Sequence, residues 1–177
     1  LASDAKIQVD FNPEVISHYR LLGYEKRDIA DVDFRNDKID AGEVGPGSTV
    51  TAIYEIKRAR PIGSLGRLHL RYRDETSRRF EEFDYDLPTG VLAGSLEDTT
   101  DRFRFIAAIS EFAEILRQSY YARDASYGAI LEVMASNSPP YRARAGWREA
   151  RELITKAQGL SAIEALQALE AQELFSP

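Results

Sequence analysis

The sequence of 177 residues contains no cysteine, one methionine, one tryptophan and two histidines. Without cysteine the chain can form neither a disulfide bond nor a zinc site with thiolate ligands. No apolar run approaches the roughly 18 residues that a membrane-spanning helix requires, so we expect no such segment. The formal net charge of -6 also lacks the basic excess needed to bind phosphates, and we expect no nucleic acid partner.

The chain begins LASDAKIQVDF, which has neither the basic opening nor the apolar core of a signal peptide. A pattern typical of a strand follows almost at once, and we therefore expect the chain to be a fragment of a longer protein. Hydrophobic residues make up 44% and charged residues 29%, which is typical of a globular protein.

The first half of the chain, residues 1–92, shows the period of two that indicates β-strands. We expect strands at 6–11, 15–25, 49–56, 67–73 and 79–87, with a hairpin turn at 74–77. In RLHLRYR, residues 67–73, apolar residues predicted to face the core alternate with basic residues predicted to face solvent. The apolar set is Leu68, Leu70 and Tyr72, and the basic set is Arg67, His69, Arg71 and Arg73. Short strands with one apolar face each predict an antiparallel sheet or sandwich.

The second half, residues 93–177, changes to the period of an α-helix. One expected helix has Phe105, Ile109, Phe112 and Leu116 on one face. Ser126 is a good N-cap for the next, a third follows from about Gly146, and a capping box of Ser161 and Glu164 predicts a fourth. The apolar stripe of the second is Tyr127, Ile130, Leu131 and Met134, and that of the third is Trp147, Ala150, Ile154 and Ala157. Strands followed by a bundle of about four helices predict an α+β fold, with the helical region packed as one unit with the sheet.

An acidic loop precedes the strand at 49–56, with six acids between Asp28 and Glu43. Calcium prefers such oxygen ligands. The EF-hand spacing fails, however, because counting from Asp33 puts Lys38 where glycine is needed and Val44 where the last carboxylate belongs. We interpret the loop as structural and expect no metal and no other cofactor. The alternative is a calcium- or ligand-binding β-sandwich, whose candidate ligands are Asp33, Asp37, Asp40 and Glu43.

No pattern for catalysis stands out, and we expect no enzyme activity and no catalytic residue. His18 and His69 have no serine or cysteine nucleophile near them in the sequence, and we expect His69 to be a surface histidine. Glu81 and Glu82 are adjacent on an expected strand, so their side chains point to opposite faces and cannot flank one bond.

The most distinctive charge pattern is a basic segment between Lys57 and Arg79, with eight Lys or Arg residues against two acids. One interpretation is an ordinary solvated sheet face. The other is a docking surface for an acidic protein partner, in which Arg67, Arg71 and Arg73 make the contacts.

Five blocks of the chain resemble a known family. They are AKIQVDFNP, YRLLGYEKR, DFRNDKIDAGEVGPGSTVTAIYEI, DRFRFIAAISEFAEILRQS and YARDASYGAIL, which together span about residues 5–133. The chain resembles the region C-terminal to the von Willebrand factor A (VWA) domain in bacterial YfbK-like proteins, a domain of unknown function. The family pattern DxxNDKxDAGExGxG is represented at residues 33–47. Where relatives often have a histidine before the TVTA strand, this chain has Ser48.

The resemblance implies that a VWA domain precedes Leu1 and carries its own metal site, none of whose ligands lies in this chain. It offers a second place for the helical region to pack, on that missing domain, and it implies a location in the bacterial cell envelope or periplasm. The sequence and the resemblance together predict a non-catalytic accessory module. It would support the VWA domain of the same chain and mediate interaction with a further, unidentified protein partner.

Overall fold

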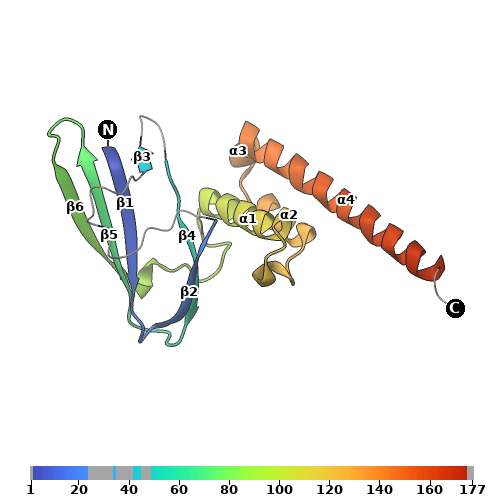
Figure 1. The fold of residues 1–177 in the computed structure, drawn as a ribbon, viewed down its shortest axis with the longest axis horizontal. Helices are drawn as coiled ribbons and strands as arrows, with labels where there is room; N and C mark the ends of the chain where they lie inside the picture. Colours follow the sequence, from blue (N-terminus) through green and yellow to red (C-terminus); the bar gives the residue numbers. More distant parts are fainter. Residues whose placement is uncertain (1, 24–33, 35–41, 45–48, 175–177) are drawn as a thin grey trace. The chain divides into compact units, whose positions relative to one another are not determined.

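The computed structural model describes residues 2–23, 34, 42–44 and 49–174 (Figure 1). The chain divides into two compact units, Leu1–Leu92 and Ala93–Pro177. The first holds antiparallel sheets and the second holds helices, which confirms the predicted α+β fold.

Two sheets make up the first unit. The four-stranded sheet has the order β3-β1-β5-β6, and the two-stranded sheet pairs β2 with β4 (Figure 1). The strands are β1 (Ala2–Phe11), β2 (Ile16–Leu22), β3 (Gly42–Val44), β4 (Ile53–Arg58), β5 (Ser64–Asp74) and β6 (Phe80–Pro88). All the pairs are antiparallel, as the sequence predicts.

A tight turn joins β5 to β6 where the hairpin is predicted. The Asp74 carboxylate accepts hydrogen bonds from the backbone N–H of Thr76 at 3.0 Å and of Ser77 at 2.7 Å. These bonds, with the Ser77 bonds foremost, lower the pKa of Asp74. Arg78 adopts a φ of 58°, which lets the chain reverse. The turn therefore fixes the register of β5 against β6.

The core of the first unit is small and lies where the two sheets meet. Its buried residues are Val15, Ile16 and Leu65, with Phe11, Ile56 and Leu87 packed against them. Gly66 permits the close approach of β5 to β1 here, because a Cβ atom at this position would lie 2.1 Å from the carbonyl oxygen of Asp10.

Helices make up the second unit, with a 3-10 turn, η2 (Thr89–Val91), in the chain just before it. The helices are α1 (Asp101–Leu116), α2 (Tyr127–Ala135), α3 (Pro139–Arg142) and α4 (Ala145–Leu174), and a second 3-10 turn, η3 (Tyr120–Ala122), follows α1. Ser126 caps α2 by accepting from the N–H of Ala129, as predicted. The predicted helix start at Ser161 is wrong, because α4 runs through that position without a break. Gly159 inside a helix costs about 1 kcal/mol, less than ending the backbone hydrogen bonds there would.

The helical core follows the predicted apolar stripes of α2 and α4. Its buried residues are Ala108, Ile130, Met134, Trp147 and Ile154. Phe105, Ile109 and Phe112 of α1 pack against this core. Leu116, expected on the same face, is 57% exposed because it lies in the last turn of α1.

A polar network ties the start of α1 to the turn after α2 and to α4. The Asp101 carboxylate accepts from the Ser138 N–H at 2.8 Å and from the Ser138 hydroxyl at 2.6 Å. The Asn137 amide donates to the carbonyl oxygen of Asp101 at 2.8 Å, and its own oxygen accepts from Trp147 Nε1 at 3.0 Å. Arg104 completes the network with an ion pair to Asp101 at 2.6 Å.

The Asp101 network predicts a loss of stability in acid. The hydroxyl and the backbone N–H of Ser138 hold the pKa of Asp101 well below its ordinary value, with help from Asn137 and Arg104. A carboxyl whose pKa is lowered by folding stabilises the protein above its ordinary pKa of about 3.9, and this contribution is lost as the pH falls below it.

We therefore expect the urea midpoint of the helical unit, followed by Trp147 fluorescence, to fall between about pH 5 and pH 3. In Asp101→Asn the same pH change should shift the midpoint less. Parallel pH profiles for the two proteins would contradict this role of Asp101.

Candidate interaction surface

The register of the four-stranded sheet places charged and apolar side chains on opposite faces. From residue 6 to residue 11, β1 pairs with β5 without a shift, and β5 continues in register onto β6. The polar face is defined by Lys6, Gln8, Asp10, Arg67, His69, Arg71, Glu82, Asp84 and Asp86. The apolar face is defined by Ile7, Val9, Phe11, Leu68, Leu70, Tyr72, Phe83, Tyr85 and Leu87.

On the polar face, bases and acids from three strands are paired. His69 of β5 lies between two carboxylates, with Nδ1 2.6 Å from Asp84 of β6 and Nε2 3.1 Å from Asp10 of β1. Arg67 forms an ion pair with Asp86 at 2.9 Å. The pairing leaves little uncompensated charge on this face, so other parts of the chain can cover it.

The polar face is covered only in part, because Asp10, Asp84 and Asp86 keep more than half of their side chains exposed. Lys6 is 3% exposed and Arg71 8% exposed, and the ring of Phe34, itself buried, lies 6.3 Å from the His69 ring. The Arg71 guanidinium lies over the Phe80 ring, 3.8 Å from its centroid. The sequence predicted the alternation correctly, but its expectation that Arg71 faces solvent is wrong, and His69 is half-buried with 17% of its side chain exposed.

The predicted arginine surface is therefore divided. Arg67 is exposed and paired with Asp86, Arg73 is half-buried, and Arg71 lies inside. A contact with an acidic partner through all three stays a prediction, and of the three only Arg67 is exposed.

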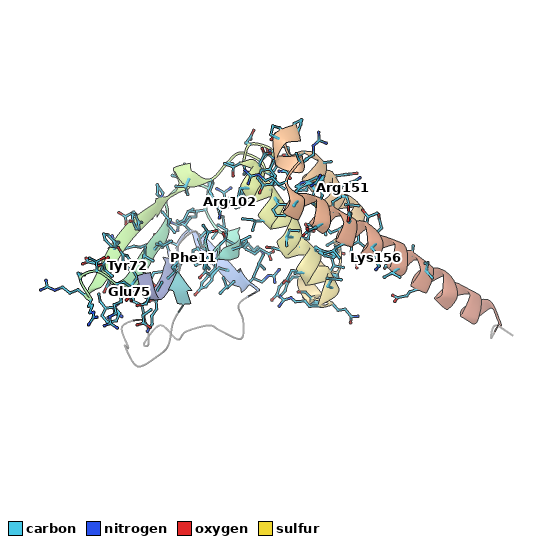
Figure 2. The ribbon with its side chains drawn as sticks, turned by 90° about the horizontal axis from the view of Figure 1, so that it is seen from above. Phe11, Tyr72, Glu75, Arg102, Arg151 and Lys156 are labelled. Atoms are coloured by element: carbon cyan, nitrogen blue, oxygen red, sulfur yellow. The ribbon has the colours of Figure 1, made fainter. Side chains whose placement is uncertain are left out.

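The apolar face is covered at one end and open at the other. Phe11 packs against Tyr19 and Tyr54 of the two-stranded sheet, with ring centroids 4.5 and 5.4 Å apart. Toward the β5–β6 turn, the rings of Tyr72 and Phe83 stack at 6.1 Å. Figure 2 shows Phe11 and Tyr72 at separate ends of this sheet. Three residues of the face remain well exposed, namely Ile7 at 50%, Phe83 at 41% and Tyr85 at 53%.

The predicted metal ligands are placed only in part. Asp33, Asp37 and Asp40 lie outside the described residues, and Glu43 belongs to β3 with its side chain not described. Within the described ranges, no three His, Asp or Glu side chains are grouped so that they could hold a metal ion. The carboxylates around His69 bind opposite ring nitrogens and so lie on opposite sides of it.

The other residues considered for catalysis are dispersed. His18 is exposed on β2, with Nδ1 3.1 Å from the Ser17 hydroxyl, and that hydroxyl donates to the carbonyl oxygen of Lys57. Glu81 and Glu82 pair in register with Tyr72 and Arg71, which places them on opposite faces as predicted. Within the part of the chain that the structure describes, no helix is long and apolar enough to cross a membrane.

Two features of the fold are not predicted by the sequence patterns. The first is the network of Asp101, Asn137 and Trp147, whose members are far apart in the sequence. The second is the open apolar face, for which β6 carried a signal, because Phe83 and Tyr85 alternate with acids in FEEFDYDL.

The fold and the sheet surface define a class of protein: an α+β module with a small sheet core, a paired polar face and an open apolar one. The chain belongs to the family described as "Uncharacterized protein YfbK, C-terminal", whose model matches residues 1–65 and 60–160. This confirms the resemblance seen in the sequence. The chain is 29% identical over 180 residues to the uncharacterized protein YfbK of Escherichia coli (strain K12), covering 92% of this chain.

The matched region spans only 31% of the length of the Escherichia coli relative. No solved structure matches the chain significantly.

Proposed function

We propose that this chain is a non-catalytic accessory module that follows a VWA domain, supports that domain and mediates protein–protein interaction. The observation that carries the proposal is the open apolar face of the four-stranded sheet, with Ile7, Phe83 and Tyr85 each more than 40% exposed. Exposed apolar patches of this kind mark contact sites on soluble proteins. The charged face, by contrast, carries bases and acids that pair with one another across its strands.

The relation to the YfbK family fits a module that stabilises a neighbouring domain. A region that spans 31% of a relative and is described as C-terminal belongs to a larger protein. Domains joined in one chain commonly pack through interfaces of moderate size. The proposed place of the whole protein is the bacterial cell envelope or periplasm, which fractionation of the source cells would test.

The test of the proposed function is the stability of the VWA domain. We expect its thermal midpoint to be several degrees lower in the isolated domain than in the full-length protein, because packing against the module stabilises only the folded state. Equal midpoints would show that the module does not support the domain. Affinity capture with the full-length protein would then identify further partners.

The absence of a calcium site is a separate prediction. We expect the thermal unfolding curves of the chain in excess calcium, in magnesium and in chelator to superimpose. A ligand at about 100 times its Kd stabilises by about 2.7 kcal/mol and would raise the midpoint by several degrees. A rise of that size with calcium alone, lost in Asp37→Ala or Asp40→Ala, would contradict this prediction.

A further inference from the structure

Among the residues that the structure describes, none covers the half of the apolar face of the four-stranded sheet nearer the β5–β6 turn. At the Phe11 end, Tyr19 and Tyr54 supply a second layer, as in a sandwich. At the other end the stacked rings of Tyr72 and Phe83 have no such layer, and Phe83 and Tyr85 keep 41% and 53% of their surface exposed. Covering these rings is favourable, since apolar burial contributes about 25 cal/mol per Å².

We propose that the part of the full-length protein N-terminal to this region docks on the open half of the apolar face, over Ile7, Phe83 and Tyr85. This inference rests on the proposed function and names the surface through which the support acts. The docked surface must be apolar, with a polar border where it meets Glu81, which pairs with Tyr72 at the end of the face.

The exposed apolar area of the open half favours a domain tethered in the same polypeptide over a second copy of the chain as its binding partner. A Phe or Tyr side chain buries about 150–250 Å² when fully covered, so Phe83 and Tyr85 still offer about 100 Å² each. With Ile7 the three residues offer about 300 Å², well below the about 800 Å² per partner of a stable association between separate chains. A tethered domain needs less area, because a short linker raises its effective concentration to the order of millimolar.

The place of the chain in its family fits this occupant. The family model describes a C-terminal region, and about two thirds of the Escherichia coli relative lies outside the match. In such a relative the preceding polypeptide leads into the strand that corresponds to β1, which carries Ile7 and Val9 of the apolar face. The polypeptide that precedes β1 therefore lies close to the apolar face that we propose it covers.

Cysteine footprinting tests this proposal, since the chain has no cysteine of its own. The variants Phe83→Cys and Tyr85→Cys place a thiol on the open half, and Thr76→Cys places one on the exposed β5–β6 turn as a matched control. Each is made in the chain alone and in the full-length protein. Reaction with a maleimide is followed at each site by peptide mass spectrometry.

We expect the rates at Phe83→Cys and Tyr85→Cys to fall by about tenfold or more in the full-length protein, because a covered thiol reacts only when the contact opens. The rate at Thr76→Cys should be the same in both proteins. Equal rates at all three sites would overturn the proposed surface.

Other outcomes separate this proposal from the function on which it rests. If the thiols stay reactive while the VWA domain is still stabilised, the module supports that domain through another surface. If neither effect is seen, both proposals fail. Protection that grows with the concentration of the chain alone would instead show that a second copy covers the face, and would also overturn the proposal.

Discussion

Asn137→Ala lowers the free energy of unfolding of the helical unit by about 2–4 kcal/mol, because it removes the hydrogen-bond partner of the Trp147 indole and of the Asp101 carbonyl oxygen. The Asn137 side chain is 2% exposed and accepts from the indole N–H of Trp147, which is itself buried. Its amide also donates to the carbonyl oxygen of Asp101. A buried donor left without a partner costs about 1–3 kcal/mol, so the loss exceeds that of one ordinary hydrogen bond.

Chemical denaturation followed by fluorescence measures this effect cleanly, since Trp147 is the one tryptophan of the chain and belongs to the helical core. Ser136→Ala is the matched control: its hydroxyl bonds to the carbonyl oxygen of Val133 at 2.7 Å in the same turn but is exposed. We expect the control to stay within about 0.5 kcal/mol of the parent. Equal losses in the two variants would contradict the role given to Asn137.

Arg71→Glu destabilises the sheet unit by about 3–5 kcal/mol, which is the usual cost of breaking a buried charge arrangement. Arg71 is 8% exposed, packs on the ring of Phe80 and pairs in register with Lys6 and Glu82. A glutamate there would place a second carboxylate opposite Glu82 in a covered site. Typical domains are stable by only about 5–15 kcal/mol, so the substitution would remove a large part of the stability of this unit.

Arg67→Glu is the comparison that isolates burial from charge. Arg67 and its partner Asp86 have side chains 54% and 73% exposed. Exposed ion pairs contribute at most about 1 kcal/mol, so we expect a small loss of stability. Hydrogen exchange of β5 peptides measures both variants, and equal exchange in the two would contradict the placement of Arg71. Partner binding through the arginines should therefore be tested with Arg67→Glu, whose fold survives.

The sequence of β5 predicted two faces but not which of their side chains are buried. Alternation in RLHLRYR follows from strand geometry alone and was confirmed in the register with β1 and β6. Burial of Arg71 and His69 depends on acids contributed by other strands and on Phe34, which is more than 30 residues away in the sequence. A sequence rule that places basic residues in solvent takes no account of contacts with residues on other strands.

In the helical unit, periodicity identified the core, because Ile130, Met134, Trp147 and Ile154 repeat at helical spacing and are all buried. The capping box at Ser161 and Glu164 is a local pattern, and the continuing helix overrode it. Asp101 and Asn137 carried no signal of their network, since an acid in a first helical turn and an asparagine beside prolines are common. Only the packed helices bring them together.

Hydroxyl-radical footprinting of the chain tests most directly whether the apolar face of the sheet is open. Phe34 on the polar side and Phe83 on the apolar side have the same intrinsic reactivity, so the ratio of their oxidation rates reports exposure. With 7% of Phe34 and 41% of Phe83 exposed, we predict that Phe83 is oxidised several-fold faster. Oxidation of Phe34 at the same rate as Phe83, or faster, would contradict the exposure of Phe83 and would remove the basis for docking there.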